Sequence, residues 1–102
     1  MKIDNMEVNV LKALAHPVRL EIVKKLLKGE RCVCELCNDN EYSQANMSQH
    51  LKILRDADVL SYKKEGNKVI YSIKHAEIKE IVVLVNNLVR TEINKLIEKT
   101  HE

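Results

Sequence analysis

Apolar residues recur at helical spacing over most of the chain, and the spacing becomes alternating in one short stretch. From Val59 to Ile73, apolar and polar residues alternate around Glu65-Gly66-Asn67, which predicts a β-hairpin with a tight turn. Elsewhere the period indicates helices. They are predicted over residues 4–15, 17–27, 34–38, 44–57 and 75–99. The pattern therefore predicts a mainly α fold with one small β-hairpin.

Residues typical of helix starts stand at three of these boundaries. Asp4 and Asn5 are expected to cap the first helix, and Ser43 is expected to cap the helix that follows it. Pro17 stands near the first position of the second helix, where its missing N–H costs least. Only two glycines and this one proline interrupt the chain, so no linker or internal repeat is indicated.

The helix predicted from Gln44 has a thin apolar seam and an unusually amide-rich remainder. Its buried face is expected to consist of Met47, Leu51, Leu54 and Ala57. The other positions carry amides, a hydroxyl, an imidazole and an ammonium group: Gln44, Asn46, Ser48, Gln49, His50 and Lys52. The long last helix is apolar over a stripe too wide for one short neighbour to cover, which suggests a partner subunit.

Composition limits the chain to one small domain, expected to span residues 1–102. It has 102 residues, 45% of them hydrophobic and 31% charged, with 17 Lys+Arg against 15 Asp+Glu and a net charge of +2. Such a balance favours nucleic acid only where basic residues cluster. They do so at the hairpin tip, where Lys63, Lys64 and Lys68 are positive and only Glu65 is negative.

No apolar run approaches the ~20 residues that a membrane span needs, and the first residues lack the apolar core of a signal peptide. We therefore expect a soluble, cytoplasmic protein without a membrane partner.

The three cysteines all lie in Cys32-Val33-Cys34-Glu35-Leu36-Cys37. An odd number of cysteines within six residues is no disulfide framework, and in a reducing compartment it indicates a soft-metal or redox site. Cys34 and Cys37 share one face of a helical turn, and Cys32 can fold back towards them. A structural zinc site needs four ligands, whereas a pyramidal thiophilic ion such as trivalent arsenic or antimony needs only three sulfurs.

The order of the elements resembles a winged helix-turn-helix, with residues 34–38 as the first helix of the motif and the helix from Gln44 as the recognition helix. Amides pair with adenine, and hydroxyl, imidazole and lysine groups reach phosphates. The predicted DNA contacts are Ser43, Gln44, Asn46, Ser48, Gln49, His50, Lys52, Lys63, Lys64, Asn67 and Lys68.

From about Leu11 to Ile78 the chain resembles the ArsR/SmtB family of metal- and metalloid-responsive repressors. The resemblance rests on four stretches, LKALAHPVRLEI from Leu11, CVCELC from Cys32, SQANMSQHLKILR from Ser43 and GNKVIY from Gly66. It implies a dimeric winged helix-turn-helix protein: a homodimeric repressor that leaves double-stranded operator DNA when an inducer binds, with genes of arsenical efflux or reduction under its control. It also implies that His16 caps the second helix.

The cysteine pattern resembles that of the arsenic- and antimony-sensing members, which implies Cys32, Cys34 and Cys37 as inducer ligands and no permanent cofactor. The first and last helices are expected to form the dimer. Its predicted interface residues are Leu11, Leu14, Ile81, Val85 and Leu88.

Other functional hypotheses stay open. The same fold could sense cadmium or zinc, or thiol oxidation, through the same cysteines. A zinc site on the last helix could begin with His75 and Glu77, but Leu88 and Thr91 further along cannot ligate. An enzyme is not expected, since no nucleophile elbow, phosphate-binding glycine loop or carboxylate pair is present. A metal-buffering protein would explain the thiols but not the amide-rich helix and lysine-tipped hairpin.

Overall fold

The computed structural model describes residues 2–38 and 44–100. Five helices and three strands are formed within these ranges, and the helices lie close to the positions that the apolar periodicity predicts. They are α1 (Ile3–Leu14), α2 (Pro17–Leu26), β1 (Arg31–Cys32), α3 (Val33–Asn38), α4 (Gln44–Asp56), β2 (Leu60–Glu65), β3 (Lys68–Ile73) and α5 (Glu77–Thr100).

Two helix starts differ in how they are capped. At α2, the ring Nδ1 of His16 accepts a hydrogen bond from the backbone N–H of Val18 at 3.1 Å, so the predicted capping role of His16 is confirmed. The prediction for α1 is wrong, because α1 begins one residue earlier, with Lys2 at the N-cap and no side-chain capping bond. Asp4 instead lies in the first turn, where the negative charge of its carboxylate interacts favourably with the positive end of the helix dipole.

The strands form one antiparallel sheet in the order β1-β3-β2. The predicted hairpin is present: Glu65 pairs with Lys68 across a turn in which Gly66 has a φ of +62°, a conformation that glycine adopts without steric cost. Strand β1 was not predicted. It has two residues, with Arg31 opposite Tyr71 and Cys32 opposite Ile70, and so short a strand leaves no alternating pattern in the sequence.

One apolar core joins the helices to the sheet. The α4 seam is its centre, since Met47, Leu51 and Leu54 are all at most 1% exposed. Helices α1, α2 and α3 and strand β2 all contact α4. The buried residues of this core are Ala13, Leu14, Val18, Ile22, Val23, Leu26, Leu36, Met47, Leu51, Leu54, Val59, Leu60, Tyr71, Ile78 and Val82.

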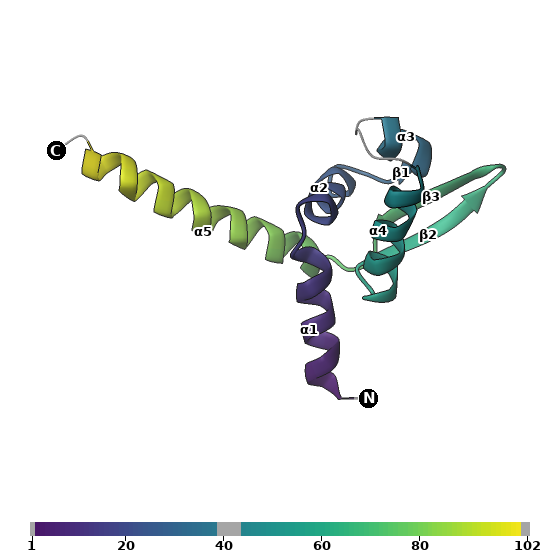
Figure 1. Ribbon diagram of the computed structural model, residues 1–102, viewed down its shortest axis with the longest axis horizontal. Coiled ribbons are helices and arrows are strands. Elements are labelled where there is room, and N and C mark those ends of the chain that lie inside the picture. Colours follow the sequence, from purple (N-terminus) through teal and green to yellow (C-terminus); the bar gives the residue numbers. More distant parts are fainter. Residues whose placement is uncertain (1, 39–43, 101–102) are drawn as a thin grey trace.

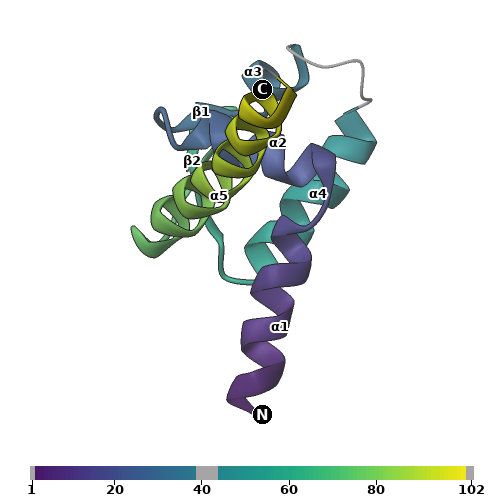
Figure 2. The ribbon, with the colours of Figure 1, turned by 90° about the vertical axis from the view of Figure 1, so that its left-hand side faces the viewer.

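Helices α1 and α5 extend away from this body in different directions, while the β2–β3 hairpin projects from the opposite side to α5 (Figure 1). Viewed at right angles, α1 again stands clear of the sheet, and α5 passes in front of it (Figure 2). Their outer ends therefore carry apolar side chains that the body does not cover. Within residues 2–38 and 44–100, no helix combines the length and apolarity required to cross a membrane.

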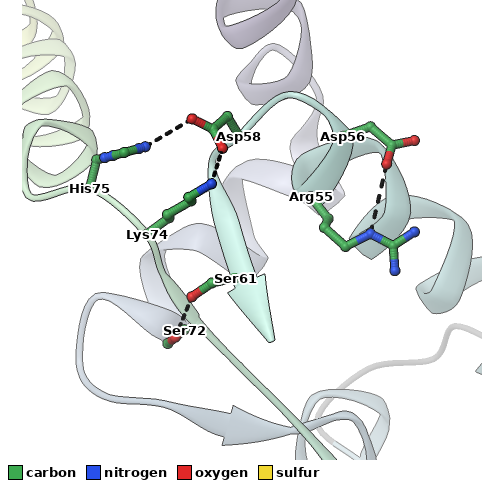
Figure 3. A network of polar contacts seen from close by, with 7 residues as sticks. All are labelled: Arg55, Asp56, Asp58, Ser61, Ser72, Lys74 and His75. Carbon is green, nitrogen blue, oxygen red and sulfur yellow. Dashed lines mark hydrogen bonds and ion pairs between the residues drawn. The ribbon is translucent and has the colours of Figure 1, made fainter. Parts of the chain in front are cut away.

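A polar junction fixes where the hairpin leaves α4 and where α5 begins (Figure 3). Asp58, just after α4, has a φ of +69°, which is unfavourable for a residue with a side chain. Its carboxylate binds Lys74 and, at 2.9 Å, Nε2 of His75. Both hydrogen bonds lower the pKa of Asp58, that from Lys74 most. The backbone N–H of Lys74 also donates to Val59 O at 3.0 Å, so the two connections are held together.

The α4 seam provides the first test of this architecture. Leu54→Ala should destabilise the protein by about 2–5 kcal/mol, because Leu54 is 0% exposed and its removal leaves a cavity in the core. Ile53→Ala, the adjacent residue at 44% exposure, should cost less than about 1 kcal/mol. Urea unfolding followed by circular dichroism measures both. Equal losses would show that α4 does not present this face to the core.

Candidate functional site

The exposed face of α4 carries the polar side chains that the sequence assigns to DNA. Asn46, Ser48, Gln49 and Lys52 are exposed, while the seam of the same helix is buried. Gln44 is the first residue of α4, and Ser43 lies outside the described residues. Because α3 contacts α4 and the chain passes from one to the other, the pair has the arrangement of a helix-turn-helix.

The β2–β3 hairpin, with its turn at Gly66 and Asn67, is hereafter the wing. Its three lysines are not equivalent. Lys64 and Lys68 are exposed and form no ion pair with any described residue. The ammonium group of Lys63 lies 3.1 Å from a carboxylate oxygen of Glu65 and 3.5 Å from one of Glu30. Both carboxylates raise the pKa of Lys63, and the hydrogen bond to Glu65 contributes most. They also offset the positive charge of Lys63.

His50 points towards α2 and not along the outer face of α4. Its Nδ1 lies 3.4 Å from Nη1 of Arg19, and its ring centroid lies 4.7 Å from that of His16. Arginine can only donate, so His50 Nδ1 accepts and is unprotonated. Burial, and then the charges of His16 and Arg19, lower the pKa of His50. Its predicted contact with DNA stays a prediction.

Arg19 is a residue that the sequence reasoning missed. Its Nε donates to Ala13 O at 2.7 Å, so its guanidinium connects the end of α1 to His50 on α4. Its position in the sequence, one helical turn after His16 and on the same side of α2, could have indicated that the two side chains lie close together.

The cysteines lie at the junction of β1 and α3. Cys32 is buried, and its sulfur is joined to that of Cys34 in a disulfide. Cys37, half-buried one turn further along α3, is a free thiol. No three His, Cys, Asp or Glu side chains within residues 2–38 and 44–100 are arranged to hold a metal ion. The three sulfurs therefore do not form a ready-made tripod in this state.

Cys32 also caps α3. The backbone N–H of Glu35 donates to the Cys32 sulfur at 3.3 Å, and the Glu35 carboxylate accepts from the Cys32 N–H at 3.3 Å. This reciprocal pair has the pattern of a capping box, in which a Ser or Thr usually occupies the first position. Arg31 supports it through a 3.9 Å ion pair with Glu35. A Cys-x-x-Glu spacing before a short helix could have revealed this in the sequence.

The predicted interface residues line or flank an apolar groove of about 380 Å³ between α1, α2 and α5. Leu11, Val85 and Leu88 are exposed, by 59%, 51% and 65%, and Ile81 is half-buried. Leu14 is 8% exposed and belongs to the chain's own core, so it contributes only the wall of the groove.

Residues 16–62, which contain the helix-turn-helix and the first part of the wing, match the family model described as bacterial regulatory protein, arsR family. The arsenical resistance operon repressor of Staphylococcus aureus is 38% identical over 77 residues, which cover 76% of this chain and 74% of that protein. The chain belongs to the ArsR family.

Two further proteins are similar to this ArsR chain. A cadmium resistance transcriptional regulatory protein CadC homolog of Staphylococcus aureus is 40% identical over 74 residues, 72% of this chain and 61% of that protein. The solved structure of HlyU from Vibrio cholerae is 36% identical, has a TM-score of 0.77, and matches 86% of this chain and 97% of that one.

These findings confirm the predicted winged helix-turn-helix fold and the prediction of a DNA-binding transcriptional regulator, not an enzyme.

The His50 contact makes the stability of this ArsR chain depend on pH. Because the folded state lowers the pKa of His50, the unfolded state binds the proton more tightly, and stability should fall as pH drops through about 6.5. His50→Gln should reduce this acid-induced loss in thermal unfolding measured over that range. Gln49→Ala, next in the chain and without a titratable group, should retain it. An unchanged loss in His50→Gln would exclude this origin.

Proposed function

We propose that this chain is a homodimeric repressor that binds operator DNA through α4 and the wing, and is released when trivalent arsenic or antimony binds Cys32, Cys34 and Cys37. The observation that carries the proposal is the position of these cysteines on α3 and on β1 just before it. Helix α3 contacts α4, whose exposed face carries Ser48, Gln49 and Lys52. We place the protein in the cytoplasm, with its DNA, as one domain over residues 1–102 with dimerisation helices at both ends.

The cysteine chemistry fits a three-coordinate thiophilic ion. The disulfide shows that the side chains of Cys32 and Cys34 can meet, and Cys37 follows on the next turn of α3. Cellular thiols would first reduce the Cys32–Cys34 disulfide, forming their own disulfide in exchange. Three thiols then react with arsenous acid, As(OH)₃, to form three As–S bonds and release three waters.

Release from DNA follows from the double use of the Cys32 sulfur. In the capping pair that sulfur accepts from the Glu35 N–H, and an ion bound to it competes for the same lone pairs. Loss of a cap costs a helix about 1 kcal/mol, and α3 has only six residues. Leu36 of α3 is fully buried in the core that holds α4, so a distorted α3 displaces the recognition helix.

Dimerisation is supported by the uncovered apolar surfaces. Helix α5 extends well beyond the body (Figure 1). Exposed apolar side chains continue along it to Ile97, and α1 also exposes several, among them Ile3 and Leu11. A contiguous apolar surface of this kind is unfavourable in water unless a partner covers it. The apolar groove between α1, α2 and α5 could bind helices of a second copy of the chain. Two recognition helices would then read half-sites about 34 Å apart, or a multiple of that.

Thiol oxidation is a second candidate signal, and the Cys32–Cys34 disulfide favours it. Two thiols transfer two electrons and two protons to a hydroperoxide, which is reduced to an alcohol and water while the disulfide forms. Cadmium and zinc remain alternatives through the same cysteines, and one relative of this chain is a cadmium resistance regulator homolog.

Fluorescence anisotropy distinguishes these signals. The probe is a labelled duplex selected from a random-sequence library with the reduced protein. Arsenite or antimonite should weaken binding by about 5–150-fold, the usual range for coupled sites. Cys32→Ser, Cys34→Ser and Cys37→Ser should each resist release. Serine at residue 32 can still cap α3, so that variant should fold.

The competing outcomes separate cleanly in the same assay. Release by hydrogen peroxide that needs Cys32 and Cys34 but not Cys37 would establish oxidation as the signal. Release by zinc in all three serine variants would move the sensor away from the cysteines, to His75, Glu77 and α5. A reduced protein that selects no sequence would overturn DNA binding itself.

The dimer interface can be tested on α5. Leu88→Glu places a charge on an apolar position that is 65% exposed in the single chain, and it should raise the dimer dissociation constant at least tenfold, about 1.4 kcal/mol. Asn87→Glu adds the same charge at an exposed polar position one residue away and should have a smaller effect. Analytical ultracentrifugation measures both. A monomeric wild type would contradict the proposed assembly.

A further inference from the structure

A cavity of about 330 Å³ lies between the cysteine segment, the recognition helix and the wing. One wall is Cys32, Val33 and Cys34, at the end of β1 and the start of α3. The facing walls come from elements assigned to DNA. They are Ser48 of α4, with Asn67, Lys68, Val69 and Tyr71 of the wing. We name this space the α3–wing cavity.

The polar groups of the α3–wing cavity are suited to an oxyanion. Ser48 offers a hydroxyl, Asn67 an amide and Lys68 an ammonium group, all of which can donate. Lys68 is opposite Glu65 in the hairpin, but Glu65 binds Lys63, and no described residue forms an ion pair with Lys68. At about 30 Å³ per water molecule, the volume accommodates a phosphate group with several waters.

The position of the cavity indicates which molecule would supply the oxyanion. A recognition helix and a wing contact the same duplex at neighbouring points, and the phosphates between those points are the groups that fix a protein's register on DNA. Ser48 and Lys68 belong to these two elements and open on one space.

We propose that the α3–wing cavity binds a backbone phosphate of the operator, and that Cys32 and Cys34, as its opposite wall, make phosphate binding and inducer binding mutually exclusive. This inference rests on the proposed function and names the point at which its two ligands meet. An ion bound to Cys32, Cys34 and Cys37 removes space beside the first two of these residues and rearranges the wall on which the phosphate lies. The phosphate is one of several contacts that the operator makes, so the operator still binds when the inducer is present, but more weakly. Linkage requires that operator DNA and inducer lower each other's affinity by the same factor.

The wing provides a matched pair of variants. Lys68→Gln removes the positive charge of a residue that lines the cavity, and Lys64→Gln removes that of a residue that does not line it. Each should weaken binding to the selected duplex and reduce the slope of log K against log salt by about 0.9, the loss of one phosphate contact. Only Lys68→Gln should also change the response to the inducer.

The decisive quantity is the ratio of duplex dissociation constants with and without arsenite. If the phosphate is the interaction that arsenite disrupts, Lys68→Gln should lower this ratio at least fivefold towards one, because a missing contact cannot be lost again. Ser48→Ala should lower it in the same direction. Lys64→Gln should keep the wild-type ratio within twofold.

The outcomes separate this inference from the proposed function. Wild-type release by arsenite together with an unchanged ratio in Lys68→Gln would overturn the shared cavity and leave the repressor proposal standing. A wild type that arsenite does not release would overturn both. Inorganic phosphate, titrated without DNA, identifies the source of the oxyanion. If it weakens arsenite binding at millimolar concentration as strongly as the duplex does, the site binds free phosphate and the proposed operator contact is wrong.

Discussion

The burial of one seam of α4 is the constraint on which the rest of the structure depends. Met47, Leu51 and Leu54 are withdrawn from solvent by the helices and the strand that contact α4. A helix held by so narrow a seam must expose the remainder of its surface. That remainder carries Ser48 and Gln49, so the packing that stabilises the core also decides which side chains are offered to DNA.

The sequence predicts this part of the molecule well because the relevant signals are local and periodic. The α4 seam repeats every three or four residues, and the wing alternates around a turn that requires Gly66. The candidate site is predictable to the same extent: spacing alone places Cys34 and Cys37 on one helical turn, and α4 with its polar face outward.

What the sequence does not predict depends on contacts between distant residues. The two-residue strand β1 exists because Arg31 and Cys32 pair with β3, some forty residues later. His50 appears on a helical wheel as one more polar residue, yet the approach of α2 turns it towards Arg19. Asp58 carries no pattern at all; its positive φ is supported by Lys74 and His75, from beyond the hairpin.

The charge of the wing also depends on contacts with residues outside it. Counted along the sequence, Lys63, Lys64 and Lys68 look equivalent, but Lys63 is engaged by Glu30 and Glu65. To bind a phosphate, Lys63 must first lose these carboxylates, whereas Lys68 begins without an ion-pair partner among the described residues. Exposed ion pairs are weak and screened by salt, so the difference should be greatest at low ionic strength. Glu30 immediately precedes β1, and Lys63 therefore also connects the wing to the strand that leads into the cysteines.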